Sequence, residues 1–182
     1  MAILSSIGSF FLDILETVVV SSLIFVVVYV FIAQPFQVKG DSMKPNLHDG
    51  EYLLVSKLSY RFGHPARGDI IVFEYPNAPQ YDYVKRIIGL PGETIEIKGD
   101  TVYINKKVLD EKYLAEEIIT TGKSFLKEWV QFKIPEGEYF VMGDNRERSS
   151  DSRQWGTLPA KNIIGKSWIR YWPLSAVEVI HQ

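Results

Sequence analysis

Residues 17–33, with the sequence TVVVSSLIFVVVYVFIA, form a stretch without a single charged residue. At about 1.5 Å per residue, this stretch makes roughly 26 Å of helix, which approaches the thickness of a bilayer core. In lipid a single spanning segment must be helical, because only a helix or a closed barrel satisfies the backbone. The apolar segment upstream extends the run, and its Asp13 and Glu16 suit the membrane interface. Pro35 disfavours helix at Gln34, so we predict that the helix ends there.

Two other interpretations of this stretch stay open at this point. It could be a buried core element of a soluble protein, or a cleavable signal peptide, although it lacks a basic n-region and a clear A-x-A site. Residues 1–38 contain no Lys or Arg, so the positive-inside rule has little to count and charge leaves the topology open. We predict an N-terminal transmembrane anchor at residues 1–35 and a β-rich domain at residues 36–182.

Composition excludes several kinds of site. The formal net charge of -2 gives no reason to expect a nucleic-acid partner. The chain has no cysteine, so neither a disulfide nor a thiolate metal site is proposed. The histidines, His48, His64 and His181, lack a metal-ligand spacing. We therefore expect no metal and no cofactor.

From residue 36 onward, short apolar or alternating runs are broken by Gly, Pro and Asp, a pattern typical of strands. The runs are EYLLVSKL, GDIIVFEY, YVKRIIGL, TIEI, TVYIN, WVQFKI, EYFVMGD and IGKSWIRYW. TIEIKGDTVYIN indicates a hairpin that turns at residues 98–100. Only KYLAEEI, residues 112–118, is a candidate for a short helix. We predict a mainly β fold, folded over or partly closed like a barrel.

Three stretches concentrate polar residues within this β pattern: residues 40–43, 83–93 and 142–156. In the second stretch Lys85 and Arg86 fall in an otherwise apolar strand. Because successive side chains of a strand point to opposite faces, the two cannot both reach solvent if either face is covered. Each stretch also has a simple structural explanation. Ser42 suits a turn, Lys85 suits an edge strand, and the third stretch suits a turn clamped by arginine.

A serine nucleophile needs a base, and no histidine of this chain stands in a comparable motif. A lysine can serve if it is neutral. Lowering its pKa from about 10.4 to about 8 costs roughly 3 kcal/mol, and burial among apolar groups supplies such shifts. Lys85, between Val84 and Ile87 in sequence, is the lysine best placed for burial. Spacing alone does not join Lys85 to Ser42.

Together the stretches resemble the boxes of the type I signal peptidases, bacterial membrane-bound serine proteases with a Ser-Lys dyad. GDSMKPNL resembles the nucleophile box, GDIIVFEYP the strand after it, YVKRIIGLPGE the lysine box and GDNRERSSDSR the late Gly-Asp-Asn-Arg box. By this resemblance Ser42 is the nucleophile, Lys85 is the general base, and Ser149 orients the lysine. The resemblance also implies that four further residues brace the site as buried ion pairs: Asp144, Arg146, Asp151 and Arg153.

The resemblance further implies a compact, single-anchor enzyme with a short cytoplasmic N-terminus and an external catalytic domain of the signal peptidase type. Its partners would be the bilayer and secretory preproteins, cleaved after small residues at −1 and −3. The pocket walls would be Val38, Met43, Leu47 and Val84, without a charged group. One departure concerns Gly40, because some members place there a serine that holds the oxyanion. The Ser42 amide would then act, with the Gly40 backbone or water.

Three alternatives remain at this stage. A self-cleaving, repressor-like Ser-Lys protease would need an internal scissile bond and usually a DNA-binding region, and the anchor argues against it. A membrane-anchored β module that binds peptides without chemistry would not need both Ser42 and Lys85. An endoplasmic-reticulum-type peptidase would use histidine where this chain has Lys85.

Overall fold

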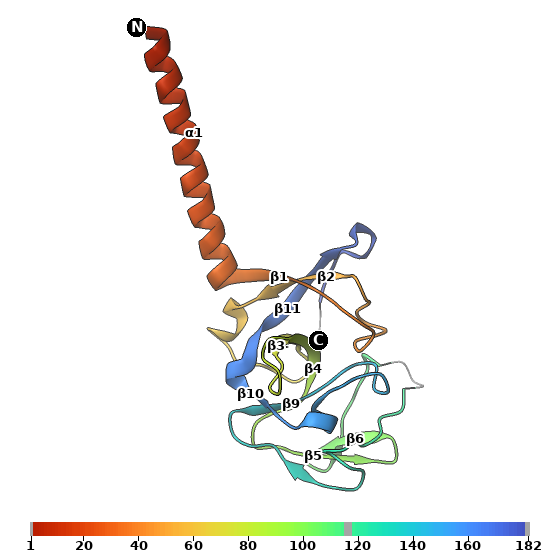
Figure 1. Cartoon of the computed structure of the whole chain (residues 1–182). Helices are drawn as coiled ribbons and strands as arrows, with labels where there is room; N and C mark the ends of the chain where they lie inside the picture. Colours follow the sequence, from red (N-terminus) through yellow and green to blue (C-terminus); the bar gives the residue numbers. More distant parts are fainter. Residues whose placement is uncertain (1, 115–117, 181–182) are drawn as a thin grey trace.

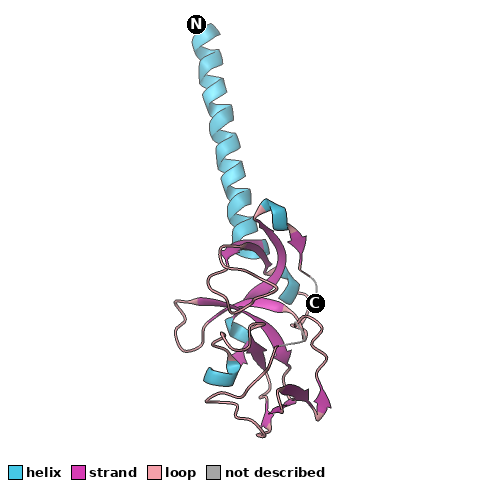
Figure 2. Ribbon diagram, turned by 90° about the vertical axis from the view of Figure 1, so that its right-hand side faces the viewer, coloured by secondary structure: helices cyan, strands magenta, loops and turns pink. Residues whose placement is uncertain are grey.

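The N-terminal part of the chain is one long helix. The computed structural model describes residues 2–114 and 118–180, in which α1 (Ala2–Val27) continues as a π-helical turn (Val28–Ile32). Both views show α1 standing away from the β domain (Figures 1 and 2). The apolar segment Phe10–Ile32 has a mean hydropathy of 2.5 and is not buried in the protein. Its length and composition suit a membrane span.

The helix ends at Ile32, two residues before the predicted end at Gln34. Strand β1 (Ala33–Gln37) begins immediately and pairs antiparallel with β2 (Tyr52–Ser56). Lys57, just after β2, binds the end of the helix through its backbone N–H to the Ile32 carbonyl at 2.9 Å. Strand pairing therefore stops the helix before the restriction imposed by Pro35 acts.

The main sheet has eight strands and is antiparallel throughout. Its order is β1-β2-β11-β3-β4-β9-β10, and β12 pairs with β11. The strands not yet located are β3 (Ile70–Glu74), β4 (Asp82–Gly89), β9 (Glu138–Met142), β10 (Leu158–Pro159), β11 (Ile163–Trp172) and β12 (Glu178–Val179). The mainly β prediction is confirmed, but the path ends at β1 and β10, so the described sheet is not closed into a barrel.

A second sheet of four strands forms the end of the molecule far from α1 (Figure 1). Its order is β7 (Lys107–Val108), β6 (Thr101–Ile104), β5 (Thr94–Lys98) and β8 (Phe132–Lys133). The predicted β5–β6 hairpin is confirmed, with Gly99 and Asp100 as its two-residue loop. Their φ angles of 50° and 66° are the positive values that such tight hairpin loops require.

Some local predictions were only partly right. The predicted strand WVQFKI shrinks to β8, because Trp129 takes a positive φ of 64° that breaks the extended backbone. Residues 112–114 of the predicted helix KYLAEEI form a turn, and residues 115–117 lie outside the described residues. The short helices of the described chain are η2 (Leu58–Tyr60), α2 (Ser152–Trp155), η3 (Ala160–Asn162) and η4 (Leu174–Ala176).

Strand β3 is buried on both faces, which explains its continuous apolar sequence. Ile70 and Val72 join one core cluster, and Ile71 and Phe73 join another. Strand β4 has the same double burial at its C-terminal half, from Lys85 to Gly89. Fully burying an aliphatic side chain contributes about 1.5–3 kcal/mol, so these central strands hold β4 firmly in place.

Candidate active site

Ser42 lies in a tight turn that follows β1. Buried residues of the same turn anchor it in the core. Met43 and Leu47 are fully buried in the same cluster as Ile70 and Val72. The 142–156 stretch also holds the turn, because the Asn145 N–H donates to the Ser42 carbonyl at 3.0 Å. Ser42 is thus held between the core and the 142–156 stretch.

Lys85, in β4, points to Ser42. Its Nζ lies 2.8 Å from Ser42 Oγ and donates to the Val84 carbonyl at 2.8 Å. The side chain is only 4% exposed, and no carboxylate of the described residues forms a salt bridge with it. Among the described side chains, Lys85 is the one hydrogen-bonded to Ser42 Oγ, whereas His48 faces Glu51.

Burial sets the protonation of Lys85. Burial lowers the pKa of Lys85 to about 8, although the negative charges of Asp151 and Asp144 raise it. The positive charge of Lys123 lowers the pKa further. An amine with this pKa is neutral in a substantial fraction of molecules near pH 8. A neutral amine can donate to the Val84 carbonyl and still offer its lone pair to the Ser42 hydroxyl.

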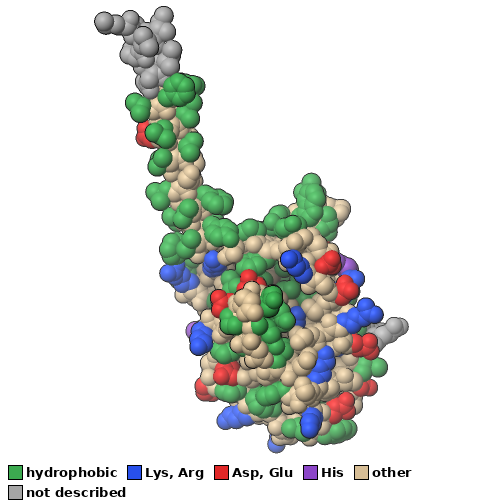
Figure 3. All heavy atoms as spheres, in the orientation of Figure 1, with side chains coloured by type: hydrophobic (Ala, Val, Ile, Leu, Met, Phe, Trp, Pro, Cys, Tyr) green, Lys and Arg blue, Asp and Glu red, His purple; other side chains and the backbone are tan. Residues whose placement is uncertain are grey.

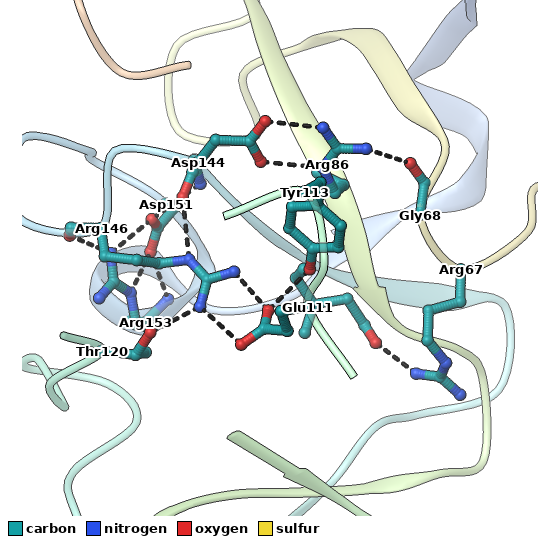
Figure 4. Close-up of polar contacts among 12 residues, drawn as sticks. Arg67, Gly68, Arg86, Glu111, Tyr113, Thr120, Asp144, Arg146, Asp151 and Arg153 are labelled. Carbon is teal, nitrogen blue, oxygen red and sulfur yellow. Dashed lines mark hydrogen bonds and ion pairs between the residues drawn. The ribbon is translucent and has the colours of Figure 1, made fainter. Parts of the chain in front are cut away.

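Arg86, the next residue of β4, points to the opposite face and pairs with a carboxylate. Its Nε and Nη2 donate to the two oxygens of Asp144 at 2.9 and 2.7 Å, and its Nη1 donates to the Gly68 carbonyl (Figure 4). Asn46, four residues after Ser42, donates to Asp144 at 2.8 Å. Asp144 therefore connects the serine turn, β4 and the 142–156 stretch.

Two further buried arginines brace the 142–156 stretch (Figure 4). Arg153 donates to both oxygens of Asp151, at 2.9 and 2.8 Å. Arg146 donates to both oxygens of Glu111, at 3.1 and 2.5 Å, rather than to an aspartate of its own box. Burial opposes the ionisation of Asp151, but Arg153 and the Gly143 amide outweigh it and lower the pKa of Asp151.

Ser149 is buried beside these groups. Its hydroxyl lies close to the Asp151 carboxylate, at a geometry short of a standard hydrogen bond, and has no other partner among the described residues. A Cβ on Gly143 would stand 2.3 Å from Ser149 Oγ and 2.4 Å from the Ser42 carbonyl oxygen. Glycine at 143 therefore allows the two serines to approach. Lys123 donates to the Ser149 carbonyl.

Gly40 has a positive φ of 83°, and its N–H donates to Asp49 Oδ1 at 2.6 Å. This amide is therefore already occupied. The Ser42 N–H, in contrast, has no hydrogen-bond acceptor among the described residues. Of these two amides, only that of Ser42 is free to donate to a developing oxyanion.

A cavity of about 430 Å³ opens above Ser42 and Lys85. Val38 and Val84 are among its lining residues, whereas Met43 and Leu47 belong to the core beneath it. The expectation of a pocket without charged groups was wrong, because four charged residues besides Lys85 also line the cavity: Lys39, Asp41, Asp82 and Arg148. These four residues form the charged rim of the cavity. The alternation of apolar and polar residues in the sequence did not predict that they line it.

Sequence reasoning missed several residues of this region. Glu111 and Tyr113 belong to no box, and Asn46 lies in the nucleophile box but was assigned no role. Each contacts a box residue: Glu111 pairs with Arg146, the centre of the Tyr113 ring lies 4.0 Å from the Arg86 guanidinium, and Asn46 donates to Asp144. The sequence signal was weak, because Glu111 and Tyr113 lie in a polar loop. Arg86 was noted for its alternation, but its partner was not foreseen.

Comparisons with known proteins show the family of this chain. A family model described as signal peptidase, peptidase S26, matches residues 11–172. The chain belongs to this family. It is therefore a serine endopeptidase of signal peptide processing.

Two curated relatives illustrate the similarity to this family. A signal peptidase I of Bacillus licheniformis is 39% identical over 166 residues, covering 89% of this chain and 89% of the relative. A signal peptidase IB of Staphylococcus aureus is 38% identical over 177 residues, covering 90% and 92%. Among solved structures, a signal peptidase I from Enterococcus faecalis has 37% identity and a TM-score of 0.46, covering 56% of this chain and 95% of that chain.

Proposed function

We propose that this chain is a single-pass membrane enzyme that removes signal peptides from secretory preproteins with Ser42 as nucleophile and Lys85 as general base. The observation that carries the proposal is the 2.8 Å contact between Lys85 Nζ and Ser42 Oγ at a buried site that opens into a cavity. A buried lysine without a carboxylate partner is costly in its charged form, and such perturbed groups concentrate at functional sites.

The reaction begins when Ser42 Oγ attacks the scissile carbonyl carbon and its proton passes to neutral Lys85. The Oγ–C bond forms, and the carbonyl electron pair becomes an oxyanion, to which the Ser42 N–H donates. The C–N bond then breaks, and the Lys85 ammonium gives its proton to the leaving amine. Water attacks the acyl-enzyme with Lys85 as base, and Ser42 takes the proton back as the signal peptide leaves.

The remaining box residues position Ser42 and Lys85 and take no part in bond making or breaking. Ser149, with a buried hydroxyl free of standard hydrogen bonds, is available to orient Lys85 when the lysine loses its bond to Ser42. The ion pairs of Asp144 with Arg86 and of Asp151 with Arg153 hold the turn and the strand at fixed separation. Rigid support of this kind matters because small misplacements of reacting atoms cost rate.

Residues 1–35 form the anchor in this proposal, and residues 36–182 form a catalytic domain on the extracytoplasmic side. The bilayer then holds both the enzyme and the apolar segment of its substrate, which raises their local concentration. The apolar part of the cavity, with Val38 and Val84, suits small residues at −1 and −3 of the substrate. No metal or cofactor takes part in the proposed reaction.

The test is cleavage of a purified preprotein by the full chain in detergent. Ser42→Ala and Lys85→Ala should each lower the rate by at least about 10⁴-fold, as for other paired nucleophiles and bases. Lys85→Arg should fail as well, because a guanidinium keeps its proton. Ser124→Ala, at an exposed serine bonded to the Gln154 carbonyl, is the matched control and should cleave normally.

Covalent labelling distinguishes the proposed enzyme from a module that binds peptides without catalysing a reaction. A serine-reactive acylating inhibitor should modify Ser42 in the wild type, at a position found by peptide mass spectrometry. Lys85→Ala should react far more slowly, because the serine has lost its base. An unmodified wild-type chain that still binds preprotein would contradict the enzyme proposal.

A further inference from the structure

A second pocket, of about 510 Å³, lies where the membrane helix meets the β domain. It is lined by residues from the end of the helix, from the turn after β2 and from β11, among them Val30, Phe31, Lys57, Arg61, His64 and Ile164. None of its lining residues contributes to the Ser42 cavity. The proposed reaction therefore does not explain it.

The pocket is positively charged. Lys57 Nζ donates to the carbonyls of Tyr29 and Val30, each at 3.3 Å, and so covers the end of the helix. The Arg61 guanidinium lies 5.7 Å from the centre of the Phe31 ring and has no ion pair among the described residues. The pocket lining contains no Asp or Glu. The lining therefore carries positive charge and no carboxylate, which suits an anion.

The carboxylate behind the pocket does not cancel this charge. Tyr60, in the lining, donates to Asp69 at 2.8 Å. Asp69 is itself buried and forms a salt bridge with Lys166 at 2.5 Å. Its negative charge is thus balanced within the protein.

With α1 spanning the membrane, as in the proposed function, the pocket lies at the membrane surface. Val30 and Phe31 are the last residues of the apolar segment before Ile32, so they mark the depth at which hydrocarbon gives way to lipid headgroups. Next to Arg61, Phe62 is 87% exposed. An exposed aromatic residue beside a cation is typical of an interfacial segment. Figure 3 shows blue cationic side chains next to the base of the helix, on one side of it.

We propose that this pocket binds the phosphate of an anionic phospholipid, with Arg61 and Lys57 as its cationic ligands. Phe62 inserts among the acyl chains beside it. The proposal rests on the proposed function only in that α1 spans the membrane. The bound lipid fixes the tilt of the β domain relative to the bilayer, which sets how far the Ser42 cavity stands from the membrane.

The test is native mass spectrometry of the full chain in detergent, titrated with phosphatidylglycerol or phosphatidylcholine. The wild type should bind one phosphatidylglycerol more tightly than phosphatidylcholine. Arg61→Gln should weaken phosphatidylglycerol binding about fivefold, the effect of one basic residue near an anionic lipid surface. Lys107→Gln is the matched control, because it removes one exposed charge from β7 in the distal sheet and should bind as the wild type does.

A photoactivatable phosphatidylglycerol gives a second measurement, and its crosslinks should map to residues 57–65. Equal binding of both lipids, an unchanged affinity for Arg61→Gln, or an equal loss for Lys107→Gln would each overturn the proposal. Displacement of the lipid by millimolar inorganic phosphate would also overturn it, because the site would then bind the free anion. Preprotein cleavage, measured in the same samples without lipid, tests the proposed function separately.

Discussion

The two faces of β4 each hold a buried basic residue, but the two residues have different partners. Lys85 and Arg86 are 4% and 2% exposed, so both are removed from water. Arg86 meets both oxygens of Asp144, whereas Lys85 meets a hydroxyl and a carbonyl. The comparison teaches that burial alone does not decide charge. The charge of Arg86 is matched by Asp144, whereas burial drives Lys85, which has no carboxylate partner, toward its neutral form.

The difference also separates structure from chemistry. The Arg86 face, with the Arg146 and Arg153 pairs beside it, joins three segments that are far apart in sequence. The Lys85 face opens into a cavity and holds a group that can exchange a proton. Substitutions on the two faces should therefore have different consequences.

The largest expected contrast is between Lys85→Met and Arg86→Met. Lys85→Met should lower preprotein cleavage by at least about 10⁴-fold, while the free energy of unfolding stays equal or rises, because an unmatched buried amine is removed. Arg86→Met should lower the free energy of unfolding by about 3–5 kcal/mol, because Asp144 is left buried and unpaired. Cleavage and chemical unfolding of the full chain in detergent measure both effects.

The double variant Arg86→Met/Asp144→Leu is the control for this contrast. Replacing both partners by apolar residues leaves no unpaired charge, so much of the lost stability should return. If Lys85→Met destabilised the fold as much as Arg86→Met, the two faces would not differ as described.

The next effect is a dependence of activity and stability on pH. Cleavage should rise with pH through about 8, as Lys85 loses its proton. The pKa is lower in the folded state than in the unfolded state, so the unfolded chain binds the extra proton between about pH 8 and 10.5. The contribution of Lys85 to the free energy of unfolding therefore rises with pH across that window, by about 3 kcal/mol in total.

The stability effect is measured as the difference between the wild type and Lys85→Met from pH 7.5 to 9.5. Subtraction removes the contributions of other titrating groups, such as Tyr60, whose burial raises its pKa. A rate that falls as pH rises through 8 would contradict a neutral lysine base.

A smaller effect is expected at Gly40, next to the Lys85 face. Its positive φ disfavours any side chain, although a Cβ there would meet open space. Gly40→Ala and Gly40→Ser should each lose about 1 kcal/mol of stability and some turnover, because strain displaces Ser42. Thermal unfolding and cleavage of both variants measure this. Higher turnover in the serine variant than in the alanine variant would show that a hydroxyl here assists the oxyanion.

The smallest effect is expected at Lys123, whose charge lowers the pKa of Lys85 and whose Nζ donates to the Ser149 carbonyl. Lys123→Met should shift the pH–rate profile to slightly higher pH, whereas Lys123→Arg should keep it in place. A loss of rate at all pH values without a shift would assign Lys123 a purely structural role.

Much of the fold could be predicted locally. Alternating or continuous apolar runs located β2, β3, β4, β5, β6, β9 and β11, and the Gly99–Asp100 loop located the hairpin. Strands β7, β10 and β12 have two residues each, too few for a period to be recognised. The charged rim of the cavity was also missed, because its four charged residues come from three separate segments.

The sequence by itself determined the apolar helix, the mainly β body and the order of the boxes, because these depend on neighbouring residues. Only the tertiary structure decided which groups meet. Ser42 and Lys85 are 43 positions apart, and Arg86 and Asp144 are 58 apart. It also paired Arg146 with Glu111 and gave the Gly40 amide to Asp49. Such contacts depend on the order in which strands pair, with β11 between β2 and β3, and local sequence patterns do not specify that order.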